Sequence, residues 1–483
     1  MESLIMLLIV AYFFTIFLIS RMAGGSGFET SSFFTGDKSS KWYVVAGGMI
    51  SASISGISIV SVPGMVGSSG FTYLQMVLGF FFGYLVIAYV LLPLYYRLNL
   101  TSIYGYLELR YGLHSHKVGA MFFILFKIVA ATSRLYVVLI VLQYYIFDKW
   151  NIPFMVSASV LILFIFIYTF RSGIKALVWT DFFQTTCLVV SLVLLLWSVA
   201  QHLNMDFNTM VSTIYGRPES KLFVFDDFYS RQNFFKQFLS GIFVVIVMTG
   251  LDQDVMQKNL TCKNLHESRK NMLSYGICFV PVNLILMCLG VLLLTLAERE
   301  NINLPDTPDH ILPFFAMNYF GGAVSIFFII ALISAAFSSA DSALVSLTTS
   351  VSVDMLGLDD KKLSFRRRMV IHFFLCILFI FVIFLFSLIN SQSALDSIYT
   401  MVSYLYGPLL GMFTFGILTK YAVRDSLVPY VAIISPVLCF MISWCVSSVF
   451  SYKFGYELLL MNGLLTMLGL YLTRRRGEMV PEI

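Results

Sequence analysis

The sequence predicts an all-α membrane protein that crosses the bilayer thirteen times. Of its 483 residues, 59% are hydrophobic and only 12% are charged, whereas soluble domains have roughly 45–50% and 25%. Apolar segments of about 20 residues, enough to span a bilayer as a helix, recur along the whole chain. The longest connection between them, 201–233, is too short for a soluble domain. This composition excludes an ordinary soluble protein, and no basic patch with soluble flanks suggests a nucleic-acid partner.

Thirteen apolar segments are separated by turn residues and charges. They lie at 3–20, 42–66, 71–97, 117–147, 152–170, 174–200, 234–256, 271–297, 322–353, 367–389, 394–419, 427–448 and 455–473. The first segment has no positive start, because Glu2 is the only charge before it and Arg21 follows it. That order favours a retained first span over a cleaved signal peptide.

The positive charges alternate between loops as the positive-inside rule requires. With the N-terminus outside, the inside loops carry 22 of the 31 Lys and Arg residues, Lys258 among them, and the outside loops carry 7. The remaining two, Lys127 and Arg134, fall within the fourth span. We therefore expect a multi-pass protein of a plasma membrane or a cell inner membrane, with its N-terminus outside and its C-terminus in the cytoplasm.

The second span, 42–66, is rich in residues that form helices poorly. It contains Ser51, Ser53, Ser55, Ser58 and Ser61 together with Gly47, Gly48, Gly56, Pro63 and Gly64. A break in this helix would free carbonyl and hydroxyl oxygens that can coordinate a cation. The alternative is close helix packing through small residues, but the density of serine favours a break.

The ninth span, 322–353, carries two neighbouring patches of oxygen ligands. Ala335, Ser338 and Ser339 share one helix face, since they are spaced at i, i+3 and i+4. Ser338, Asp341 and Ser342 have the same spacing. Hydroxyl, carbonyl and carboxylate oxygens suit a hard cation. The alternative is serine packing, with Asp341 close enough to a helix end to reach water.

Charged residues inside the spans are costly and therefore indicate function. Asp181 lies about one turn inside the sixth span, where it is either an ion ligand or proton-relay group, or an acid favoured by the helix dipole. Arg134 lies about halfway along the fourth span. A guanidinium there requires a carboxylate or phosphate, which suggests an anionic substrate. The alternative is a structural ion pair with Asp181 or Asp341.

Six motifs carry a resemblance to a known family. They are PGMVGSSGFTYLQ, TSIYGYLELRYG, KALVWTDFFQ, TGLDQDVMQKNLTCKNLHESRKNM, AAFSSADS and YGPLLGMFTFGIL. In these motifs and their order, the chain resembles the solute:sodium symporter family over about residues 30–420. The resemblance implies a leucine-transporter-like fold with two inverted five-helix repeats and Na⁺ as the coupling ion.

The resemblance also implies how one transmembrane domain, 1–483, is organised. The span 3–20 would be an extra N-terminal helix, 42–200 the first repeat, 234–419 the inverted second repeat, and 427–473 two C-terminal spans. The seventh span would then be broken like the second, and we expect Gly241 and Gly250 to break it.

Three sets of site residues follow from the resemblance. The principal sodium site would comprise the carbonyls of Ser51, Ile54 and Ala335 and the hydroxyls of Ser338 and Ser339. A second sodium site would comprise Asp181, Ser338 and Ser342, with Asp341 as an altered or extra ligand. The substrate would contact Ser53, Ser55, Ser58, Phe71 and Gln75, and Arg134 would bind its carboxylate.

The expected function is sodium-coupled symport that imports a small organic solute by alternating access. Val245 and Met248 replace the sugar-binding Asn and the inner aromatic gate of the sugar branch, which disfavours a sugar. The similarity is closer to the sialic-acid branch, so a carboxylate such as sialic acid is expected. Proline, a short monocarboxylate, pantothenate or a sugar are the alternatives, while Arg134 speaks against a cation.

Two other classes of membrane protein fit the sequence less well. An ion channel needs a continuous polar pore, but the polar residues cluster near the middle of the membrane. An enzyme needs a nucleophile–base pair or metal ligands at depth, and no His lies there beside a Cys or Asp. The sequence indicates no obligate protein partner.

Overall fold

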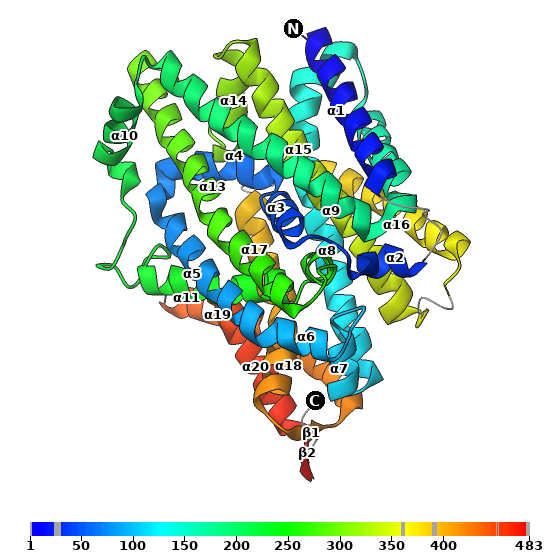
Figure 1. Cartoon of the computed structure of the whole chain (residues 1–483). Helices are drawn as coiled ribbons and strands as arrows, with labels where there is room; N and C mark the ends of the chain where they lie inside the picture. The colour runs from blue at the N-terminus through cyan, green and yellow to red at the C-terminus, as the bar shows by residue number, and fades with distance from the viewer. Residues whose placement is uncertain are drawn as a thin grey trace.

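The fold is a bundle of long helices (Figure 1), described by a computed structural model for residues 2–23, 30–358, 363–388, 394–450, 452 and 454–479. Within these residues, eight helices are long and apolar enough to cross a membrane, or up to ten if each of two bent pairs counts as one span. Two shorter apolar helices cover Phe154–Phe170 and Leu458–Leu472. The total of thirteen spans stays a prediction.

In the described residues up to His202, the first part of the bundle is built from nine helices. These are α1 (Glu2–Ala23), α2 (Thr30–Thr35), α3 (Trp42–Ser53), α4 (Gly56–Ser69), α5 (Tyr73–Val86), α6 (Leu92–Arg97), α7 (Gly105–Arg110), α8 (Leu113–Leu142) and α9 (Phe154–His202). Helix α9 covers both the fifth and the sixth predicted span, with a kink at Gly173 (φ 58°, ψ −162°). Only glycine adopts that conformation readily, so the kink separates the two spans without a longer loop.

The second part, as far as its residues are described, contains eleven helices and two short strands. These are α10 (Phe207–Gly216), α11 (Phe234–Val245), α12 (Gln253–Asn259), α13 (Leu265–Glu300), α14 (Ile311–Asn318), α15 (Gly322–Ser350), α16 (Phe365–Ser387), α17 (Ala394–Leu405), α18 (Gly407–Leu418), α19 (Val428–Phe450) and α20 (Leu458–Leu472), with strands β1 (Tyr421–Val423) and β2 (Arg474–Met479). The strands pair antiparallel. Between helices lie π-helical turns at Ile87–Leu91, Gln143–Phe147, Ile246–Gly250 and Val351–Met355, and 3₁₀ turns at Gly36–Lys38, Gly70–Thr72, Asp148–Trp150, Pro218–Ser220, Pro308–His310 and Asp425–Leu427.

Helix α15 lies in the interior of the bundle, while α1, α16 and α19 lie at its edge. In the apolar 18-residue stretch of α15, 78% of the residues are buried, against 22–28% in the corresponding stretches of the other three helices. Helix α15 packs against α9, α8, α3 and α4. A spanning helix enclosed by protein on all sides can carry polar groups that lipid would not tolerate, which is why the serines of α15 are possible at this depth.

Loops predicted on the same side of the membrane meet in the structure. On the predicted inside, the Ser40 amide donates to the Thr261 carbonyl at 3.1 Å, and Arg110 donates to the Thr419 carbonyl at 2.8 Å. On the predicted outside, Arg299 donates to the Leu203 carbonyl at 2.8 Å. These contacts agree with the predicted alternation of loops. We call the two faces inner and outer by that prediction, and their orientation in a cell stays a prediction.

The break in the seventh predicted span lies after Gly250 and not at Gly241. Helix α11 and its π-helical continuation, Phe234–Gly250, meet α12 at an angle of 69°. Gly241 lies inside regular α11 and faces α5, where a Cβ would lie 2.3 Å from the Met76 carbonyl oxygen. The expectation for Gly241 was therefore wrong, because its small size serves helix packing.

We expect Gly241→Ala to lower the melting temperature of the purified protein. The added methyl group would collide with the backbone of α5, and overpacking costs about 1–3 kcal/mol. Gly216→Ala is the matched control, because nothing lies within 4 Å of a Cβ at that position. Thermal unfolding followed by tryptophan fluorescence measures both. An equal melting temperature for Gly241→Ala and wild type would contradict the close packing of α5 and α11.

Candidate functional site

The chain is interrupted between α3 and α4 at Ile54 and Ser55. Neither residue has helical backbone angles, since ψ is 89° at Ile54 and 167° at Ser55, which is extended. The helical hydrogen bonds of α3 end with the Ile54 amide, which donates to the Ile50 carbonyl at 2.8 Å. Those of α4 begin with the Ile59 amide, which donates to the Ser55 carbonyl at 3.2 Å. Among the described residues, no backbone amide donates to the carbonyls of Ser51 or Ile54. The serine-rich segment therefore has free backbone oxygens in the interior, as a cation site requires.

Helix α15 presents its hydroxyl groups to this break. The hydroxyl groups of Ser51 and Ser338 lie 2.8 Å apart, and the Ser339 hydroxyl donates to the Ala335 carbonyl at 2.9 Å. The five residues of the first predicted ion site are all buried: Ser51, Ile54, Ala335, Ser338 and Ser339. The break and the oxygen-rich face of α15 thus lie together, and their neutral oxygens fit a monovalent hard cation.

A small cavity of about 70 Å³ adjoins the break. Its polar lining consists of Ser53, Tyr84, Lys127, Arg134, Thr249, Asp252, Asp254, Tyr275, Ser339 and Tyr399, and its apolar lining includes Phe80, Phe126, Val245, Met248 and Phe279. Ser339 belongs both to this lining and to the first predicted ion site. A solute in the cavity and a cation at the break would therefore be close neighbours.

Two carboxylates in the cavity wall share Lys127 as an ion-pair partner. Its ammonium lies 2.7 Å from Asp254 and 3.2 Å from Asp252. The Tyr406 hydroxyl also donates to Asp252 at 2.8 Å, and Asp252 accepts the Asp254 amide at the start of α12. Neither carboxylate is among the site residues predicted from the sequence, although the Asp-Gln-Asp run at the end of the seventh span is a visible signal.

Arg134 is a cationic group of the cavity, and the Asp254 carboxylate in the same lining acts on it electrostatically. Its guanidinium makes no ion pair or hydrogen bond with any residue that the structure describes, and its buried Nε is unsatisfied. Asp181 instead pairs with Lys258, and Asp341 accepts a hydrogen bond from Tyr168 at 2.7 Å. The structural ion pair of Arg134 with Asp181 or Asp341 is therefore not formed, and the guanidinium faces the cavity available to a ligand.

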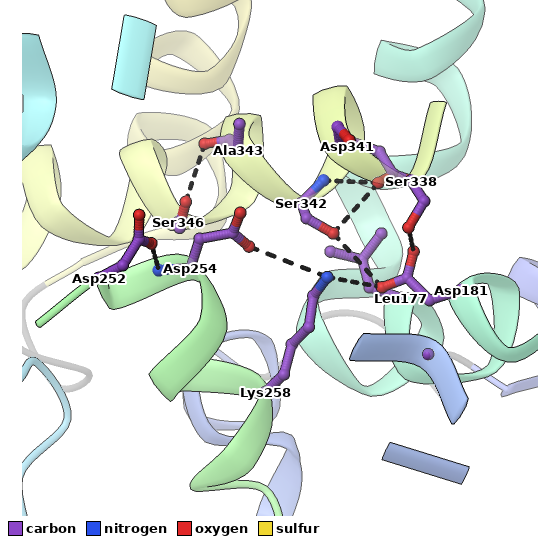
Figure 2. A network of polar contacts seen from close by, with 12 residues as sticks. Leu177, Asp181, Asp252, Asp254, Lys258, Ser338, Asp341, Ser342, Ala343 and Ser346 are labelled. Atoms are coloured by element: carbon purple, nitrogen blue, oxygen red, sulfur yellow. Dashed lines mark hydrogen bonds and ion pairs between the residues drawn. The ribbon is translucent and has the colours of Figure 1, made fainter. Parts of the chain in front are cut away.

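The second predicted ion site has its residues together but contains a lysine (Figure 2). Ser338 donates to Asp181 at 2.7 Å, and Ser342 lies 3.3 Å from Asp181 and 3.2 Å from Asp341. The Lys258 ammonium lies 2.8 Å from the same Asp181 carboxylate. The sequence reading placed Lys258 in an inside loop, which was wrong: α12 carries it into the interior, where it is 1% exposed.

Only Ser53 and Arg134 among the six predicted substrate residues line the cavity. The Tyr275 hydroxyl donates to Ser53, while the Ser55 and Ser58 hydroxyls lie 3.5 Å apart, away from the lining residues. Phe71 and Gln75 lie toward the outer face. Gln75 donates to the carbonyls of Thr72 and Gln232 and accepts the Val224 amide. Its amide group secures the 201–233 loop, so the structure does not support Ser55, Ser58, Phe71 or Gln75 as cavity residues.

A larger pocket of about 380 Å³ opens on the outer side. Tyr73 and Tyr456 line this outer pocket, while Tyr399 lines the inner cavity. The Tyr73 and Tyr399 hydroxyls lie 3.1 Å apart, and the rings of Tyr399 and Tyr456 pack with centroids 5.0 Å apart. The linings of the outer pocket and of the inner cavity therefore meet at these tyrosines.

The sequence is similar to proteins that carry small anions with sodium. It is 29% identical over 423 residues to the sodium-coupled monocarboxylate transporter 1 of Mus musculus, covering 83% of this chain and 66% of that protein. The chain thus spans slightly less than two thirds of that relative. It is 24% identical over 429 residues to the sodium/sialic acid symporter NanT of Aliivibrio fischeri, covering 83% of this chain and 82% of that protein.

Solved structures share the fold. A Na⁺-coupled sialic acid symporter, in a substrate-bound outward-open state, superposes with a TM-score of 0.79 over 96% of both chains at 19% identity. The nucleobase-cation-symport-1 family transporter Mhp1 superposes with a TM-score of 0.56 over 92% of this chain and 94% of that one, at 11% identity.

The family comparison covers most of the chain. The sodium:solute symporter family matches residues 33–425, which include the break between α3 and α4, the cavity and α15. Such proteins are membrane transporters and not enzymes, and their coupling ion is Na⁺. The chain therefore belongs to the sodium:solute symporter family.

Proposed function

We propose that this protein uses the entry of Na⁺ to import a small organic carboxylate, which Arg134 binds in the cavity. The observation that carries the proposal is the unpaired guanidinium of Arg134 in a cavity whose other cation, Lys127, is already neutralised. Arg134 is half-buried and its buried Nε has no hydrogen-bond partner, and a bidentate carboxylate satisfies such a guanidinium best. The relatives' names, which include monocarboxylate and sialic acid transporters, support an anionic solute.

The coupling ion is assigned to the break between α3 and α4. Its ligands are the carbonyls of Ser51, Ile54 and Ala335 and the hydroxyls of Ser338 and Ser339. An ion there ties the broken helix to α15 and so stabilises the outward-facing state. Because Ser339 also lines the cavity, Na⁺ and the carboxylate bind side by side and each lowers the electrostatic cost of burying the other. Ion and solute then favour the same conformation.

Two inverted repeats fit the positions of the helix breaks. The first break, at Ile54–Ser55, lies in the first span of the predicted repeat 42–200. The second break, after Gly250, lies in the first span of the predicted repeat 234–419. Broken helices at equivalent positions of two repeats are typical of transporters that bind solute at the midplane. Alternating access then follows from rocking of one repeat against the other, with the N-terminus outside the cell.

The cavity favours a short monocarboxylate, with sialic acid as the second candidate. Its volume is only about 70 Å³, and Val245, Met248 and three Phe rings provide an apolar wall that suits a short carbon chain. A sugar would leave the hydroxyl groups that face this apolar wall unpaired, and buried hydroxyl groups must be paired. Sialic acid would require the tyrosines toward the outer pocket to separate further.

Uptake into proteoliposomes with an inward Na⁺ gradient tests the solute class. Radiolabelled pyruvate, N-acetylneuraminate, glucose, proline, pantothenate and choline are compared at equal concentration. We expect uptake of pyruvate, of N-acetylneuraminate or of both, and no uptake of glucose or choline. Transport of a neutral sugar or a cation without transport of any carboxylate would contradict the proposal.

Ser339→Ala is expected to raise the half-saturating Na⁺ concentration of uptake about five- to tenfold. The substitution removes one proposed ion ligand, and losing such a contact costs about 1 kcal/mol. Ser346→Ala is the matched control, because Ser346 is equally buried on α15 but bonds only the Ala343 carbonyl. An unchanged Na⁺ dependence in Ser339→Ala would remove this residue from the ion site.

A further inference from the structure

The second predicted ion site already contains a cation that belongs to the chain. Lys258 lies on α12, immediately after the break in the seventh span, and reaches the interior beside α9 and α15. Figure 2 shows its ammonium between Asp254 and Asp181, at 3.9 Å and 2.8 Å from their carboxylates. The Lys258 and Asp181 side chains are 1% and 0% exposed. Water therefore does not compete with this ion pair.

The ligands that a second Na⁺ would need are used by this arrangement. Both oxygens of Asp181 are engaged, since Oδ1 accepts a hydrogen bond from Ser338, while Oδ2 lies 2.8 Å from the Lys258 ammonium and accepts a hydrogen bond from Ser342 at 3.3 Å. A Na⁺ ion bound to Asp181 Oδ2 would lie next to the ammonium, where two positive charges repel strongly in a medium of low dielectric constant. The residues present therefore do not fit a second Na⁺ while Lys258 occupies this position.

Asp341 does not restore the second site. Its Oδ2 accepts from the Tyr168 hydroxyl at 2.7 Å, and its Oδ1 accepts from the Ser342 amide at 2.6 Å. The same Oδ1 lies 3.2 Å from the Ser342 hydroxyl. These partners hold the Asp341 carboxylate against α15. The Ser342 hydroxyl, which both carboxylates would share as a neighbouring ligand, already forms hydrogen bonds to Asp181 and to Asp341. The first ion site differs, because its oxygens come from neutral groups and Lys258 makes no contact with them among the described residues.

We propose that the Lys258 ammonium is the resident cation of the second position, so that the transporter binds a single Na⁺, at the break between α3 and α4. The inference rests on the proposed function, since it concerns how many ions that function couples. It has a structural consequence: the ion pair of Lys258 with Asp181 links α12 to α9 where a second Na⁺ would otherwise bridge α9 and α15. The chain then needs one ion where the resemblance implies two.

Direct binding of ²²Na⁺ to the full-length protein in nanodiscs tests the inference without knowledge of the solute. We expect one ion per wild-type chain, with a Hill coefficient near 1. Lys258→Gln removes the ammonium and keeps a polar side chain, so a second ion should bind and the stoichiometry should rise to two. Lys258→Arg retains the charge and should stay at one. Lys263→Gln, at an exposed lysine on the inner face, is the control for altered charge and should also stay at one.

Three results separate the possible failures. Two ions per wild-type chain, or a single ion in both wild type and Lys258→Gln, would contradict the role of Lys258 and leave sodium symport intact. No saturable Na⁺ binding in the folded wild type would contradict the proposed ion site itself. If Lys258→Gln does not fold, Ser342→Ala is used instead, because Ser342 belongs to the second predicted ion site and not to the first. We expect the Na⁺ binding isotherm of Ser342→Ala to equal that of wild type. Weaker binding of a second Na⁺ ion in this variant would overturn the inference.

Discussion

Arg134→Ala is expected to abolish measurable carboxylate uptake while leaving Na⁺ binding in place. Truncating one partner of a buried, hydrogen-bonded charge pair costs about 2–5 kcal/mol, which corresponds to roughly 30-fold to several-thousand-fold weaker binding. The loss should appear chiefly in the affinity for the solute, because Arg134 touches neither the break nor α15 ligands in the described structure. Proteoliposome uptake over a range of solute concentrations, together with ²²Na⁺ binding, measures both quantities.

Two further variants separate a lost contact from a damaged protein. Arg134→Lys keeps the charge but loses the bidentate geometry, so it should recover part of the affinity. Arg299→Ala removes an arginine that binds the Leu203 carbonyl at the outer face and should leave uptake near normal. Carboxylate uptake by Arg134→Ala with an unchanged half-saturating solute concentration would show that another group binds the anion.

Lys127→Met is expected to destabilise the protein by about 3–5 kcal/mol, which is the usual effect of removing one partner from a buried ion pair. The substitution keeps an apolar chain of similar length but leaves Asp252 and Asp254 without their shared cation. Both carboxylates are nearly buried, at 2% and 4% exposure, so water cannot replace the lost charge. A lower melting temperature and a lower yield of folded protein should result.

A partly exposed ion pair provides the control for this prediction. Lys175 and Asp37 lie 3.4 Å apart with side chains 34% and 43% exposed, and such pairs contribute about 0–1 kcal/mol. Lys175→Met should therefore have a small effect on the melting temperature. Equal melting temperatures for Lys127→Met and Lys175→Met would mean that the interior ion pair does not stabilise the fold.

Local chemistry explains why the break between α3 and α4 and the oxygen-rich face of α15 could be predicted from the sequence. The break at Ile54 and Ser55 lies within a run of serine and glycine that forms helix poorly. The helical spacing of Ala335, Ser338 and Ser339 gives their common face directly. Both signals are contained in short stretches of sequence, so no knowledge of distant contacts was needed.

Long-range pairing explains what the sequence could not give. Lys258 looked like one more positive charge of an inside loop, and only the 69° bend before α12 brings it beside Asp181. The choice of Lys258 over Arg134 as the partner of Asp181 depends on the packing of α12 against α9, which no spacing reveals. Gln75 likewise looked like a binding residue until the 201–233 loop was seen to use its amide group.

The affinity of the purified protein for its carboxylate in Na⁺ and in K⁺, at equal ionic strength, tests the central claim most directly. The claim is that an ion at the break and an anion at Arg134 bind next to each other and stabilise the same state. We predict at least about tenfold tighter carboxylate binding in Na⁺, and by linkage an equal gain in Na⁺ affinity when carboxylate is present. Equal carboxylate affinity in the two salts would contradict the account.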